Sequence, residues 1–98
     1  MIALTPEASA QVDALEHFYI DEQRPQALRN LGHALAEASL IITNAPERGI
    51  AAPRPYPALS ELGFSWLKRG RYWIAYNPNI PIIAGVFFET EDIPNRLR

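Results

Sequence analysis

The hydrophobic periodicity of this chain changes once along its length, and this change limits the fold more than any other feature. Up to residue 45, apolar residues recur at steps of three and four, which is the period of an amphipathic α-helix. After Gly63 they alternate with other residues or form short continuous runs, as β-strands do. Helices followed by strands, with no alternation between the two, predict an α+β fold.

The helical part divides at a proline. A first helix is predicted to begin after Thr5, a residue type that caps helices, with Pro6 in the first helical position. Pro25 ends this helix and can open a second one, which stops at Asn44-Ala45-Pro46. Because only a residue or two separates the helices, we expect an antiparallel helical hairpin.

Three strands are predicted in the second part of the chain. Phe64–Lys68 and Arg71–Asn77 flank Arg69-Gly70, a tight-turn signal that favours a hairpin. The apolar run Ile82–Glu89 predicts a central strand that is buried on both faces. With a short extra strand at Ile2–Leu4, the order becomes β-α-α-β-β-β, in which the helical hairpin packs on an antiparallel meander.

Two segments lack the periodicity of a regular element. Four prolines between residues 46 and 57 predict an extended loop, and the tail from Asp92 onward is polar and short. We expect a single domain over residues 1–98. Its predicted core residues share the apolar faces of the helices and strands: Val12, Leu15, Leu28, Leu31, Leu35, Ile42, Ile74, Ile83 and Phe87.

Several classes of protein are excluded or disfavoured by composition. The chain has no cysteine, which excludes disulfides, thiolate catalysis and cysteine-based metal sites. His17 and His33 lack further ligands at metal-binding spacing, and the glycines form no phosphate-binding loop. We therefore predict no catalytic residue, no metal site and no cofactor. The N-terminus lacks a basic region, and the longest apolar run cannot span a bilayer, so we expect a cytoplasmic protein without membrane contact.

Charge is unevenly distributed along the chain. Residues 1–47 carry two arginines against seven acids, whereas residues 48–77 carry five cations against Glu61 alone. Three of these cations, Lys68, Arg69 and Arg71, stand among aromatic residues at the predicted hairpin turn. Such a turn can bind phosphate by charge and bases by stacking. It also suits an ordinary sheet whose aromatics form the core and whose cations keep the turn soluble.

Four segments resemble, in order and at the usual spacing, the ParE branch of the RelE/ParE toxin superfamily. The first is the helix start Leu4-Thr5-Pro6-Glu7-Ala8. The second, Asn44-Ala45-Pro46-Glu47-Arg48-Gly49, is close to the family's Asn-Pro-Glu-x-Gly. Gly70-Arg71-Tyr72-Trp73-Ile74-Ala75-Tyr76 is similar to its Gly-Arg-Tyr-x-Ile-x-Tyr strand, and Glu91-Asp92-Ile93-Pro94 stands where the family has Arg-Asp-Ile-Pro.

The resemblance implies the toxin component of a type II toxin–antitoxin system with the β-α-α-β-β-β fold. ParE-like toxins poison DNA gyrase by binding and are not hydrolases. A small DNA-binding antitoxin of the ParD kind would neutralise the toxin in a hetero-oligomer. The toxin would then contact DNA only through the antitoxin or gyrase. The residues expected to contact the target are Arg54, Lys68, Arg69 and Arg71. Those expected to bind the antitoxin are Trp66, Tyr72 and Trp73.

Two other functions stay open. The first is the RelE-like activity of a ribosome-dependent mRNA endoribonuclease. It would require four cations to converge on one groove: Arg48, Arg54, Arg69 and Arg71. Against it, Glu89 and Glu91 stand where cations are expected, and no aromatic residue follows Phe88. The second alternative is an interaction domain of the same fold without toxicity.

Overall fold

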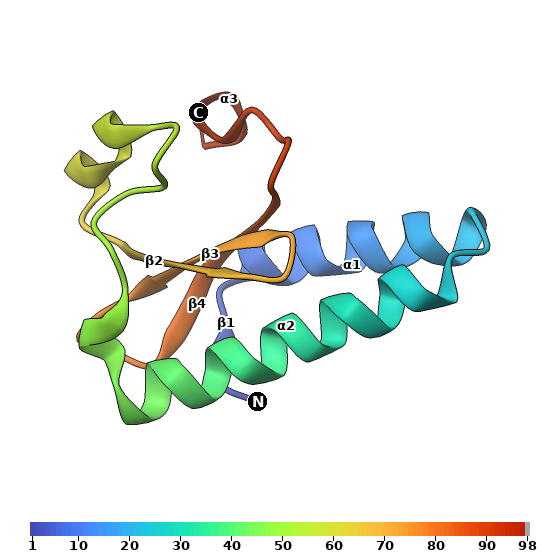
Figure 1. Ribbon diagram of the computed structural model, residues 1–98, viewed down its shortest axis with the longest axis horizontal. Coiled ribbons are helices and arrows are strands. Elements are labelled where there is room, and N and C mark those ends of the chain that lie inside the picture. Colours follow the sequence, from blue (N-terminus) through green and yellow to red (C-terminus); the bar gives the residue numbers. More distant parts are fainter. Residues whose placement is uncertain (98) are drawn as a thin grey trace.

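Two long helices and a four-stranded sheet make up the fold in the computed structural model, which describes residues 1–97 (Figure 1). None of the helices in this described part is long and apolar enough to cross a membrane. The α+β prediction is confirmed. The elements follow in the order β1 (Ala3–Leu4), α1 (Pro6–Asp21), α2 (Pro25–Asn44), η1 (Pro46–Arg48), η2 (Pro57–Leu62), β2 (Ser65–Arg69), β3 (Tyr72–Asn77), β4 (Ile82–Phe88) and α3 (Ile93–Arg96), where η marks a 3₁₀ helix.

The sheet has the strand order β1-β4-β3-β2. Strands β2, β3 and β4 form the expected antiparallel meander, and β1 adds to β4 in parallel, with Leu4 opposite Ile83. Strand β4 therefore has a neighbour on each side, which confirms its prediction as a central strand. Strand β2 is left at the edge, where its outer backbone groups meet a loop or solvent.

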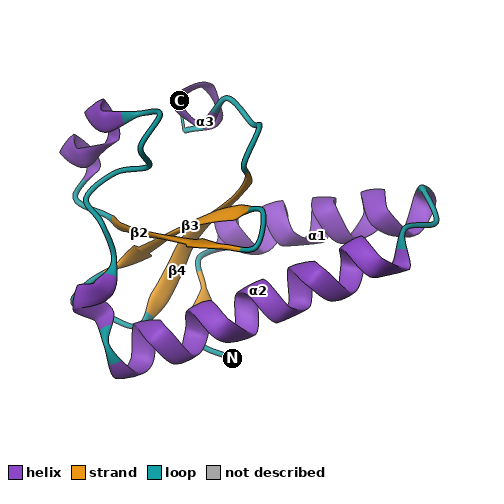
Figure 2. Cartoon of the chain, in the orientation of Figure 1, coloured by secondary structure: helices purple, strands orange, loops and turns teal. Residues whose placement is uncertain are grey.

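The helical hairpin forms as predicted. The Thr5 side chain accepts a hydrogen bond from the Ala8 amide at 3.1 Å, and Pro6 occupies the first turn of α1. Pro25 occupies the first turn of α2. In the link between the two helices, Gln23 has a positive φ of 52°. Both helices lie on one side of the sheet, and the hairpin extends beyond it (Figure 2).

The main core lies between the hairpin and the sheet. Most of the predicted core residues are buried, but Leu15 and Leu28 are only half-buried, because they pack at the margin of this core where the hairpin leaves the sheet. The buried members of the cluster are Ala8, Val12, Tyr19, Leu31, Ala34, Leu35, Ala38, Ile42, Leu67, Tyr72, Ile74, Tyr76, Ile83 and Val86.

A second layer covers the opposite face of the sheet, and it corrects two expectations. The segment expected to be an extended loop, residues 46–57, contains η1 and leads into η2. The tail, expected to be polar and short, contains α3. Leu59 of η2 and Ile93 of α3 turn inward onto Trp66, Trp73 and Phe87, which would otherwise expose large apolar surfaces to water. Figure 1 shows η2 and α3 on the side of the sheet away from the long helices.

The turn between β2 and β3 lies one residue later than expected. Arg69 pairs with Tyr72, so the two turn residues are Gly70 and Arg71 rather than Arg69 and Gly70. Gly70 has a φ of 56°, a conformation that glycine adopts without the strain that a side chain would bring. The glycine therefore takes the first central position of the turn.

Candidate functional site

A groove of about 590 Å³ lies between the edge strand β2 and the loop that follows α2. We call it the basic groove because four cationic side chains and a single carboxylate line it. Its lining residues are Arg48, Ile50, Arg54, Pro55, Trp66, Leu67, Lys68, Arg69, Trp73 and Glu89.

The loop wall of the basic groove is held in place by backbone and side-chain bonds. Ile50 and Trp66 exchange two backbone hydrogen bonds of 2.9 and 2.8 Å, which add one residue to the edge of β2. The buried Tyr76 hydroxyl donates to the Pro46 carbonyl, and the absence of a side chain at Gly49 leaves room for that ring. Arg48 therefore stands on a segment that is held on both sides.

The opposite wall is the last part of β2. In an antiparallel ladder, alternate residues direct their backbone groups to the same edge. Trp66 uses its outward groups to bind Ile50, and two residues later the Lys68 carbonyl accepts a bond of 2.9 Å from Arg69 Nη1. This bond holds the Arg69 guanidinium along the outer edge of the sheet, beside the basic groove.

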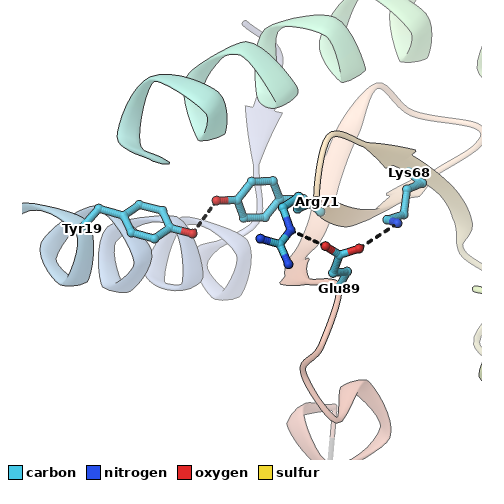
Figure 3. Close-up of polar contacts among 5 residues, drawn as sticks. Tyr19, Lys68, Arg71 and Glu89 are labelled. Carbon is cyan, nitrogen blue, oxygen red and sulfur yellow. Dashed lines mark hydrogen bonds and ion pairs between the residues drawn. The ribbon is translucent and has the colours of Figure 1, made fainter. Parts of the chain in front are cut away.

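Glu89 joins two cations at the end of the groove (Figure 3). It accepts hydrogen bonds from Arg71 Nε and from Lys68 Nζ, the latter at 3.2 Å. The bond from Arg71, followed by that from Lys68, holds the pKa of the Glu89 carboxyl below its usual range. The register of Glu89 opposite Arg71, set by the pairing of β3 with β4, makes Glu89 an ion-paired residue.

In a pH series of side-chain NMR spectra, we expect the Glu89 carboxyl to titrate at a lower pH than an ordinary glutamate does. Since its pKa is lower in the folded than in the unfolded chain, its ion pairs stabilise the fold above the unfolded-state pKa. This contribution is lost as the pH falls through the folded-state value. The melting temperatures of the wild type and Glu89→Gln should therefore differ by a small amount near neutral pH and converge in acid. A difference that persists unchanged in acid would contradict the assignment.

Arg71 does not line the basic groove, although it shares Glu89 with Lys68. It lines a second cavity, the hairpin pocket, between the α1–α2 hairpin and the β2–β3 turn. Its guanidinium carbon stands 4.8 Å from the centre of the Phe88 ring. The structure thus brings Arg54, Lys68 and Arg69 together in the basic groove and leaves Arg71 outside it.

The three aromatic residues expected to bind the antitoxin are core residues. Trp66, Tyr72 and Trp73 are 1%, 3% and 8% exposed, respectively. Tyr72 packs under the helices and the second layer packs against both tryptophans, so these rings are largely closed to a partner. Trp66 and Trp73 still line the basic groove at its floor.

The groove is equipped for binding anions more than for proton transfer. Its one carboxylate, Glu89, is held ionised by its cations and is a weak base, and no histidine lines the groove. His17 instead bonds the Asp13 carbonyl on α1, and His33 lines the hairpin pocket. Within residues 1–97, no three histidine or carboxylate side chains are grouped to hold a metal ion.

Arg48 lines the groove although it was not among the residues expected to contact the target, and Glu89 is ion-paired there. The basic run 48–77 contains Arg48, so its charge was visible, but its place in the groove depends on the bridge between Ile50 and Trp66. No protein-family model matches the chain, and a comparison with curated proteins found no relative. A functional proposal therefore rests on the fold, the groove and the sequence motifs.

Proposed function

We propose that this protein is the toxin component of a type II toxin–antitoxin system, which poisons DNA gyrase by binding it. The order of two helices and a β-meander supports this proposal, since it is the order that the ParE-like motifs imply. The basic groove is the surface proposed to contact the target.

The observation that carries the proposal is the composition of the basic groove. Arg48, Arg54, Lys68 and Arg69 gather on one edge of the sheet, although the chain as a whole has a net charge of −2. Such a local concentration of positive charge attracts phosphates and acidic surfaces. With Glu89 occupied by ion pairs, the groove offers contacts and no evident acid–base pair, which favours a binding toxin over a hydrolase.

The proposed partner is a cognate antitoxin, a small DNA-binding protein of the ParD kind, in a toxin–antitoxin hetero-oligomer. Because the tryptophans are buried, its contact with them is limited to the floor of the groove. An acidic segment of the antitoxin would meet the cations of the groove walls and block the target from the same surface. Contact with DNA would then come only through the antitoxin or gyrase.

A ribosome-dependent mRNA endoribonuclease is the second candidate, and one observation favours it. Three of the four cations that this activity requires, Arg48, Arg54 and Arg69, do line one groove. Arg71 does not, and the carboxylate of Glu89 stands in the groove where it repels a scissile phosphate.

One pair of assays tests the proposal. Purified protein is added to gyrase with supercoiled DNA, and separately to a translating extract. We expect cleaved DNA to be trapped with gyrase and ribosome-bound mRNA to stay intact. Codon-positioned cuts in the mRNA would assign the endoribonuclease activity instead. The absence of both effects, together with unimpaired growth when the chain is expressed alone, would reject a toxin and leave an interaction domain.

A further inference from the structure

The hairpin pocket is a second cavity, separate from the basic groove. It has a volume of about 570 Å³, within the range of roughly 300–1,000 Å³ that small-molecule sites occupy. The C-terminal end of α1, the α1–α2 link and the first two-thirds of α2 form one side, and the β2–β3 turn with the start of β3 and the end of β4 forms the other. The titratable side chains that line it are Tyr19, Arg24, His33, Glu37, Arg71 and Tyr72.

Two buried tyrosines in this pocket have one phenolic proton that is not used in the hydrogen bond between them. The hydroxyls of Tyr19 and Tyr72, which are 4% and 3% exposed, form one hydrogen bond with each other (Figure 3). That bond uses one of the two phenolic protons. No other residue in the described part of the chain accepts the second proton. Burial raises the pKa of Tyr72, with the bond to Tyr19 adding to it, so the Tyr72 phenol stays protonated.

Two guanidinium groups add donors with positive charge. Arg71 donates its Nε–H to Glu89 (Figure 3), and its two terminal nitrogens make no hydrogen bond within residues 1–97. Arg24 stands with its guanidinium carbon 5.7 Å from the centre of the Tyr19 ring. Both arginines are exposed enough to turn toward a ligand without disturbing the core. Glu37 is the one carboxylate that lines the pocket, and Glu89, outside that lining, pairs with the Nε side of Arg71.

The remaining lining gives the pocket an apolar wall. The Phe88 ring, the Ala34 side chain and the Pro25 ring lie along it, and Phe88 also packs edge-on against Tyr72 at 5.6 Å. A pocket with apolar walls and a few convergent donors is the usual form of a site for a small organic ligand. Here every donor group described above suits an oxyanion, because guanidinium and phenol groups donate to carboxylate or phosphate oxygens.

We propose that the hairpin pocket binds a small organic anion, a carboxylate or phosphate joined to a flat apolar body. Arg24, Arg71 and the spare phenolic proton of the tyrosine pair would hold the oxyanion, while Phe88 would cover the apolar part. This site uses different residues from the basic groove, so it does not depend on the toxin proposal.

Phenyl phosphate is a suitable probe, followed by amide chemical shifts in a ¹⁵N-labelled sample of the full chain. We expect saturable shifts at Gln26, Ala27 and Gly70, which line the pocket. Benzyl alcohol, which lacks the charge, should bind at least about tenfold more weakly, since charge-assisted hydrogen bonds are the stronger ones. Arg24→Gln should weaken the binding of phenyl phosphate by about tenfold or more. Arg54→Gln, in the basic groove, should leave the affinity of the hairpin pocket for phenyl phosphate unchanged.

The tyrosine pair is tested by the double variant Tyr19→Phe/Tyr72→Phe, which keeps both rings and removes both donors. A thermal melt establishes that this variant folds, and its affinity for phenyl phosphate should fall as well. The proposal is overturned if millimolar phenyl phosphate gives no saturable shift or if Arg24→Gln binds as the wild type does. It is equally overturned if the shifts occur at Ile50 and Lys68 instead and only Arg54→Gln weakens the binding of phenyl phosphate.

Discussion

Leu35→Ala should lower the free energy of unfolding by about 2–5 kcal/mol, the range found for leucine truncation in well-packed cores. Leu35 is 4% exposed and belongs to the cluster between α2 and the sheet. The truncation leaves a cavity that a small domain cannot easily close, and the loss is a large part of the total stability of such a domain. Thermal or urea unfolding followed by circular dichroism measures it.

The same helix supplies the matched control. Leu40 is 64% exposed, so Leu40→Ala removes the same atoms from the same helix and should change stability by no more than about 0.5 kcal/mol. An unchanged melting curve for Leu35→Ala, or an equal loss for both variants, would show that α2 is turned differently about its axis. A loss of toxicity in Leu35→Ala would report unfolding and carry no information about mechanism.

The long elements were predictable because their signals are local. Helix α2 carries its apolar stripe over 20 residues, and its buried positions follow the steps of three and four seen in the sequence. The alternation in β3, with Tyr72, Ile74 and Tyr76 on one side and Trp73 on the other, matches the two clusters observed. In each case the residues that decide the element lie within it.

The second layer was not predictable, because its signals are sparse and non-local. Leu59 is the sole buried residue of η2, and Ile93 that of α3, so neither segment shows a period. What orders them is the apolar face of the sheet presented by Trp66, Trp73 and Phe87, which belongs to other parts of the chain. Tertiary burial, rather than local propensity, decides these two elements.

The candidate site was predictable in its charge and not in its geometry. The basic run from Arg48 to Arg71 is evident in the sequence. Its division between two cavities follows from the β-turn: Arg69 is the last residue of β2 and lies along its outer edge, whereas Arg71 comes after Gly70 and faces the hairpin pocket. A shift of one residue at a turn therefore separates cations that are neighbours in sequence.

Glu89 connects the two cavities. It lines the basic groove, bonds Lys68 there, and bonds Arg71, which lines the hairpin pocket. An exposed ion pair of this kind adds little stability. Its main consequence is positional, because it fixes the Nε side of Arg71 and leaves Lys68 less available to an incoming anion. Arg48, Arg54 and Arg69 are then the cations of the groove that make no salt bridge within residues 1–97.

Under the proposed toxin function, Arg54→Ala/Arg69→Ala should abolish toxicity while leaving the protein folded. Neither side chain is part of either apolar cluster, so the melting curve should stay close to that of the wild type. Each charge-assisted bond is worth roughly 1.5–3 kcal/mol, so losing two should weaken target binding by about 100-fold or more. If the cations contact phosphates, the salt dependence of binding to the gyrase–DNA complex should also become shallower, by about one in the logarithmic slope for each cation.

Arg29→Ala/Arg96→Ala is the matched control for this last prediction. It removes the same charge from exposed positions outside the basic groove, on α2 and α3. Since its net charge equals that of the groove variant, a nonspecific effect of charge would weaken both proteins alike. We expect the control to arrest growth as the wild type does and to keep the full salt slope. Growth arrest by Arg54→Ala/Arg69→Ala at wild-type strength would show that the target is contacted elsewhere, because the basic groove would then have lost two of its three cations that make no salt bridge within residues 1–97.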